Sequence, residues 1–138
     1  MQTNRFYKKI ISLVISALLI GLGIVAYQNK WQIYDRWTAR DYIFSSDSQE
    51  VADNLNLTEQ GLRVFKSSKT EVDGKDNFRS RCPVNSYEEA NVLGCYANRR
   101  IYVLKVDEPR LTGVEEVTAA HELLHAQFER MDGATRKK

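Results

Sequence analysis

Two histidines and a glutamate lie together in the segment HELLH, residues 121–125. His121 and His125 are four residues apart, so on a helix their rings project from the same side, one turn apart. Two imidazoles placed in this way can bind one tetrahedral zinc ion through nitrogen. Glu122 follows the first histidine and suits a general base that takes a proton from water. The segment therefore predicts a Zn²⁺ site with His121 and His125 as ligands and Glu122 as the catalytic base.

The HELLH segment resembles the zincin superfamily of zinc metallopeptidases, whose signature is H-E-x-x-H. The resemblance implies the same ligands and base, and hydrolysis of a peptide bond. It also implies that RIYVLKV, residues 100–106, is the edge strand along which a peptide substrate lies, with Tyr102 as a candidate oxyanion donor. Residues 61–131 more broadly look like uncharacterised bacterial membrane-anchored proteins. The competing interpretation is a solvated helix that carries two histidines without a metal.

The third zinc ligand of this superfamily has no counterpart in the expected place. Phe128 and Met131 stand where metzincins have glycine and histidine, which excludes that subfamily. Gluzincins take a glutamate from a later helix, but Glu129 lies only one turn after His125. Three ligands in a row on one straight helix cannot converge on one ion. The remaining sources are a partner chain, a continuation of the natural protein past residue 138, which we expect, or an upstream acid: Asp107, Glu108 or Glu116.

A helix over residues 113–131 must position the HELLH side chains. Thr112 and Glu115 match a capping box at its start, and Gly133 suits its C-terminal stop. Apolar residues at spacings of three and four predict the face that packs on the core. These residues are Val117, Ala120, Leu124, Phe128 and Met131.

A β-hairpin is predicted immediately before this helix. Residues 92–97 and 100–106 read as its strands, and Asn98 tolerates the positive φ of a tight turn at residues 98–99. The second strand is apolar on both faces, so it is either covered on both sides or an edge strand with one face open to a ligand.

The middle of the chain gives weaker signals. We expect a short helix over residues 47–56 with Asp47 or Ser48 as its N-cap. A capped turn closed by Gly61 follows, then the start of a strand at residues 62–65. The charged segment 66–81 reads as a surface loop.

Cys82 and Cys95 are the only cysteines, and neither belongs to a C-x-x-C pair, which argues against a structural zinc site. In an exported domain the natural interpretation is a disulfide. The alternative is two buried thiols.

Residues 10–27 contain no charged side chain. A helix of this length is about 27 Å long and just crosses a hydrocarbon core. Arg5, Lys8 and Lys9 precede it closely, whereas only Lys30 follows it closely, which favours a cytoplasmic N-terminus. The segment therefore predicts an uncleaved single-pass anchor, and a cleaved signal peptide is the main alternative.

Aromatic side chains continue past this segment at helical spacing: Tyr27, Trp31, Tyr34 and Trp37. Such a stripe suits the membrane–water interface. The alternative is that the rings pack against the following domain.

Together these patterns predict an α+β protein with a short antiparallel sheet and an active-site helix. Its expected parts are a basic cytoplasmic N-terminus (1–9), a transmembrane helix (10–27), an interfacial helical linker (28–40) and an extracytoplasmic zincin-like domain (41–138). The formal net charge of the 138 residues is +2 without any basic stripe, which argues against nucleic-acid binding. The predicted function is a membrane-anchored zinc metallopeptidase acting on a peptide or protein substrate. The alternative is a catalytically inactive membrane-anchored binding or structural module that retains the helix.

Overall fold

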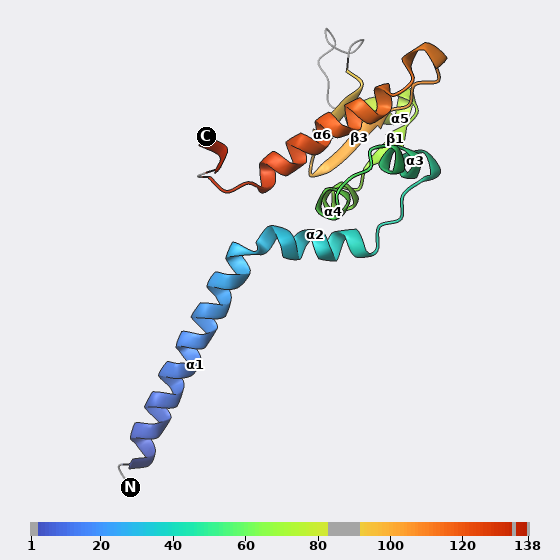
Figure 1. Cartoon of the computed structure of the whole chain (residues 1–138). Helices are drawn as coiled ribbons and strands as arrows, with labels where there is room; N and C mark the ends of the chain where they lie inside the picture. Colours follow the sequence, from blue (N-terminus) through green and yellow to red (C-terminus); the bar gives the residue numbers. More distant parts are fainter. Residues whose placement is uncertain (1–2, 83–91, 134, 138) are drawn as a thin grey trace. The chain divides into compact units, whose positions relative to one another are not determined.

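The computed structural model describes residues 3–82, 92–133 and 135–137. The chain forms two compact units, residues 1–33 and residues 34–138. The first contains α1 (Thr3–Gln28) and the beginning of α2 (Lys30–Arg40), shown in blue in Figure 1. Over Tyr7–Gln28 the mean hydropathy is 2.6 and nothing is buried. By length and composition this one helix can span a membrane, as predicted.

The second unit is rich in helices and contains a small sheet. Its elements after α2 are α3 (Ser46–Asn54), α4 (Glu59–Ser67), β1 (Glu71–Asp73), α5 (Lys75–Arg81), β2 (Gly94–Ala97), β3 (Arg100–Leu104), the 3₁₀ turn η1 (Pro109–Leu111), α6 (Val114–Arg130) and η2 (Thr135–Lys137). The strand order is β1-β3-β2. β3 pairs antiparallel with β2, as predicted, but parallel with β1, so the predicted antiparallel sheet is confirmed only for the β2–β3 pair.

Both faces of β3 are covered. Ile101 and Val103 are fully buried in the main core, together with residues of α3, α4 and α6. Tyr102 points to the opposite face, as alternation along a strand requires, and packs with Phe78 and Cys82. The covered-strand alternative is confirmed. The expectation that residues 100–106 form the edge strand is wrong, because β1 and β2 flank β3 on its two sides.

The predicted hairpin is confirmed, although both strands are shorter than expected. Asn98 and Arg99 connect β2 to β3 with φ values of 51° and 62°. Positive φ at both central residues is the requirement of a type I′ hairpin turn, whose twist matches that of the strands.

Residues 46–81 differ most from the predictions. α3 begins one residue earlier than expected, and Ser45, not Asp47 or Ser48, is its N-cap. Residues 62–65 belong to α4 rather than to a strand, because Thr58 caps a helix that continues through Gly61. Residues 66–81 contain the end of α4, the strand β1 and the helix α5 instead of a surface loop.

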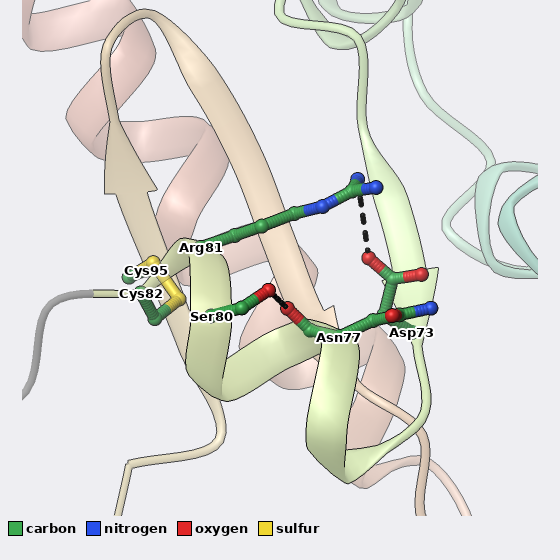
Figure 2. Close-up of a disulfide and its surroundings, with 6 residues drawn as sticks. All are labelled: Asp73, Asn77, Ser80, Arg81, Cys82 and Cys95. Atoms are coloured by element: carbon green, nitrogen blue, oxygen red, sulfur yellow. Dashed lines mark hydrogen bonds and ion pairs between the residues drawn. A yellow bond between two sulfur atoms is a disulfide. The ribbon is translucent and has the colours of Figure 1, made fainter.

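A disulfide joins Cys82, at the end of α5, to Cys95 on β2 (Figure 2). The two Cα atoms are 6.0 Å apart. Arg81 beside it pairs with Asp73 at 3.5 Å, and also with Glu71. The bond therefore ties the helix on one face of the sheet to the strand at its edge.

A buried ion pair connects α2 to the end of α6. The guanidinium of Arg130 donates to the Asp35 carboxylate from Nη2 at 2.7 Å and from Nε at 2.9 Å. Ser67 Oγ on α4 adds a hydrogen bond of 2.6 Å to the same carboxylate. Because Asp35 is only 5% exposed, this network fixes which side of α2 faces the domain.

The aromatic stripe does not act as one surface. Trp37 is 76% exposed, whereas Tyr34 is half-buried and its ring lies under the Arg99 guanidinium at 5.5 Å. The alternative in which the rings pack against the domain therefore holds for Tyr34 and not for Trp37.

Candidate active site on helix α6

Helix α6 packs on the sheet through small side chains. Ala119, Leu123 and Ala126 are buried in the main core. They follow one another at spacings of four and three, and the two alanines let the helix approach the strands closely. The predicted core stripe is wrong: its large members are exposed, at 71% for Val117, 67% for Leu124, 52% for Phe128 and 43% for Met131.

The ends of α6 also differ from the predictions. Gly113 is the N-cap, with a φ of 87° that favours glycine. Thr112 Oγ1 donates to Pro109 O, and Glu115 Oε1 accepts a hydrogen bond of 2.7 Å from Val106 N, so the capping box is not formed. The helix ends at Arg130, before Gly133, and Met131 is its C-cap with an extended backbone.

His121 and His125 lie side by side on the exposed side of α6. Their Nε2 atoms are 3.2 Å apart and their ring centroids 4.8 Å apart. Two nitrogen ligands of one tetrahedral zinc ion, each at about 2.0–2.1 Å, are separated by about 3.3–3.4 Å. The spacing of these two donor atoms therefore fits a shared zinc ion.

Glu122 is buried between α6 and β2, at 7% exposure. Burial raises the pKa of its carboxyl group, while the charges of His125 and His121 and the backbone N–H of Tyr96 act in the opposite direction. Gly94 provides the space: a Cβ there would overlap the Thr118 methyl group and lie 3.1 Å from Glu122 Cγ. A larger residue at position 94 would therefore displace this carboxylate.

One open cavity of about 530 Å³ joins these side chains to the edge strand. Its lining residues are Gly94, Cys95, Tyr96, Glu122, His125, Phe128, Glu129 and Arg136. One proposed ligand, the proposed base and a phenol therefore face the same space, bounded by β2 rather than by β3.

Tyr96 is a member of this site that the sequence did not indicate, and Glu129, considered from the sequence only as a zinc ligand, is its hydrogen-bond partner. The Tyr96 hydroxyl donates a 2.5 Å hydrogen bond to Glu129 Oε2, and Arg99 Nε donates to Glu129 Oε1 at 3.2 Å. Burial, and then the Glu129 carboxylate, raise the pKa of Tyr96 to about 12. The signal available in the sequence was the alternation of β2, which places Tyr96 and Gly94 on the face opposite Cys95.

Tyr102 does not reach this site, because it belongs to the cluster on the other face of the sheet. The oxyanion expectation for Tyr102 is therefore wrong.

The upstream acids are placed elsewhere. Glu116 Oε1 accepts a hydrogen bond of 2.7 Å from Asn54, and Glu108 pairs with Arg110. Together with Asp107 they line a separate cavity of about 360 Å³ that neither histidine lines. Among residues 3–82, 92–133 and 135–137, no group of three or more His, Cys, Asp or Glu side chains is arranged to hold a metal ion.

No protein-family model, curated protein or solved structure matches this chain.

Proposed function

We propose that the chain is a membrane-anchored zinc metallopeptidase of the zincin type. In this proposal His121 and His125 hold Zn²⁺ and Glu122 is the general base. The observation that supports it is the 3.2 Å separation of the two Nε2 atoms, close to the spacing that one tetrahedral zinc ion requires. The cavity beside His125 and Glu122 offers room for a segment of a peptide substrate.

The side chains have distinct roles in this chemistry. Bound zinc would supply a Lewis acid that polarises a carbonyl group and lowers the pKa of water. Glu122 takes a proton from the attacking water and passes it to the leaving amine. Tyr96 stays protonated at neutral pH and can donate a hydrogen bond to substrate in place of Glu129.

The proposed location is the cell membrane, with the N-terminus in the cytoplasm and residues 34–138 outside it. Arg5, Lys8 and Lys9 before the apolar helix support this orientation. The disulfide between Cys82 and Cys95 supports an oxidising compartment for the domain.

The first test is the zinc content of the purified full-length chain, measured by elemental analysis after dialysis. We expect one zinc per chain, and loss of zinc in His125→Ala. Glu122→Gln should keep the zinc but lose hydrolysis of an unfolded protein substrate by a factor of about 10²–10⁴, the usual contribution of a general base. Hydrolysis that is unchanged in Glu122→Gln would exclude the proposed mechanism.

A non-catalytic membrane-anchored module is the second candidate. It is favoured by the finding that the described residues place only two ligands beside one another. This candidate predicts no hydrolysis by the wild-type chain, whether or not zinc is bound. The same pair of measurements therefore distinguishes the two functions.

A further inference from the structure

The outward face of α2 carries an exposed tryptophan between two arginines. Asp35 fixes the rotation of this helix through its buried ion pair with Arg130. At 3.6 residues per turn, Trp37 and Arg40 lie about 140–160° around the helix from Asp35. Trp37 is accordingly 76% exposed, and Arg36 and Arg40 are also exposed.

Ile43 follows the end of α2 at Arg40 closely in the sequence. It is 88% exposed, the highest value among the large apolar side chains of the described residues. Neither Arg36 nor Arg40 forms a hydrogen bond or ion pair within the described part of the chain. Residues 36–43 thus display two large apolar side chains, two cations without an ion pair among the described residues, and one exposed carboxylate, Asp41.

The chemistry of this group matches a lipid headgroup layer. Tryptophan is enriched at membrane–water interfaces, where its ring contacts acyl chains and its N–H contacts polar groups. Arginine side chains extend their charged ends toward lipid phosphates, and anionic lipids attract them. A protein partner could also cover an exposed tryptophan, but two arginines that form no ion pair with any described residue favour an anionic surface.

Chain connectivity places a membrane within reach of this surface. Trp37 is nine residues after Gln28, the last residue of the apolar helix. Even a fully extended chain of that length reaches only about 32 Å. If the apolar helix spans the bilayer, Trp37 therefore lies within about 32 Å of the membrane end of that helix, which allows it to reach the headgroup layer.

We propose that Arg36, Trp37, Arg40 and Ile43 form a membrane-binding surface that inserts into the headgroup layer and prefers anionic lipids. This proposal depends on the membrane-anchoring part of the proposed function and not on zinc or catalysis. It adds a second, peripheral contact with lipid to the contact made by the apolar helix.

Quenching of Trp37 fluorescence by brominated lipids tests the proposal. The full-length chain is incorporated into nanodiscs of anionic and zwitterionic lipids, with or without bromine on the acyl chains near the headgroup. The chain has two tryptophans, so the difference between wild type and Trp37→Phe reports Trp37 without altering Trp31. We expect bromination to reduce the Trp37 signal about twofold or more, as for an interfacial ring.

A matched control carries an exposed tryptophan elsewhere on the domain. Val117 is 71% exposed on α6, so Val117→Trp in a Trp37→Phe background gives a reporter of similar exposure. We expect no added quenching from it. Equal quenching at positions 37 and 117 would overturn the assignment of this surface, as would a Trp37 signal that bromination leaves unchanged.

A charge variant tests the lipid preference. The double substitution Arg36→Gln and Arg40→Gln should reduce the quenching of Trp37, and raising the salt concentration on the wild type should do the same. Quenching that depends neither on the arginines nor on anionic lipid would overturn the proposed preference of this surface for anionic lipids. Failure of the chain to enter nanodiscs would instead contradict the anchoring on which the proposal depends, whereas the zinc and hydrolysis measurements stay independent of both results.

Discussion

At the scale of single residues, the buried carboxylate of Asp35 is expected to contribute strongly to the stability of the fold. Asp35→Ala leaves the Arg130 guanidinium buried without its counter-ion, and breaking such a pair costs about 3–5 kcal/mol. Urea unfolding of the full-length chain, followed by near-ultraviolet circular dichroism, measures this loss. The matched control is Arg110→Ala, which breaks an exposed pair with Glu108 and should have little effect.

Replacing both partners separates the ion pair from the packing around it. Asp35→Leu with Arg130→Met removes both charges, and such replacements are often neutral or stabilising. Recovery of most of the lost stability would assign the cost to the uncompensated charge. No recovery would mean that the hydrogen bonds of this network, including that of Ser67, carry the effect.

Tyr96 gives a prediction for alkaline pH. Its pKa is 10.0 in the unfolded reference and about 12 in the folded chain. The folded state thus favours the neutral phenol. The contribution of the Tyr96 phenol to the free energy of unfolding is therefore complete below pH 10 and is lost as the pH rises through about 12. Tyr96→Phe also removes the hydrogen bond to Glu129, at a cost of about 1 kcal/mol near neutral pH.

The difference in the free energy of unfolding between wild type and Tyr96→Phe should therefore shrink as the pH rises above 10. Urea unfolding of both chains at neutral pH and at alkaline pH measures this difference. A cost that does not change between these conditions would contradict the raised pKa.

At the scale of elements, the contact between β2 and α6 depends on Gly94. A Cβ at this position would overlap the Thr118 methyl group and crowd Glu122. We expect Gly94→Ala to destabilise the chain by about 1–3 kcal/mol, as overpacking does. It should also reduce any hydrolysis that depends on Glu122.

Thr118→Ser tests the cause of the Gly94→Ala effect, because it removes the methyl group that the new Cβ would meet. The double variant should recover part of the stability in urea unfolding. If Gly94→Ala is harmless, or if Thr118→Ser gives no recovery, the close approach of β2 and α6 does not limit stability.

The sequence predicted those elements whose local signals agree with their tertiary contacts. The hairpin followed from two apolar runs around Asn98, and α3 followed from its polar composition, although its N-cap is Ser45 and not Asp47 or Ser48. α4 was missed because Gly61 indicated the end of a capped turn, with a strand beginning after it. Thr58 instead caps a helix that continues through Gly61 to Ser67.

The prediction of which face of α6 packs on the core failed for a different reason. Two stripes run along this helix at helical spacing, one of large residues and one formed by Ala119, Leu123 and Ala126. Residue size favoured the first stripe, but close packing on the strands selects the second. The positions of the histidines on one side of the helix followed from spacing alone. Tyr96 could not be placed beside them without the register between β2 and α6.

At the scale of the whole molecule, the redox state of the disulfide reports on which side of the membrane the domain lies. Cys82 and Cys95 should be oxidised in chains isolated from membranes if residues 34–138 are exported. Thiol labelling with a maleimide polymer, before and after reduction, measures the oxidised fraction on a gel. A fully reduced wild-type chain would contradict export.

The charges that flank the apolar helix should control this oxidised fraction. Replacing Arg5, Lys8 and Lys9 with glutamine leaves Lys30 as the nearest cation, which reverses the charge bias across the helix. We expect the domain to stay in the cytoplasm in a share of these chains, where the thiols remain reduced. Lys30→Gln is the matched control, because it removes a charge but strengthens the original bias, and it should stay oxidised. Equal oxidation in all three chains would show that charge bias does not orient this protein, whereas reduction confined to the triple variant would connect the N-terminal cations to the compartment in which the domain folds.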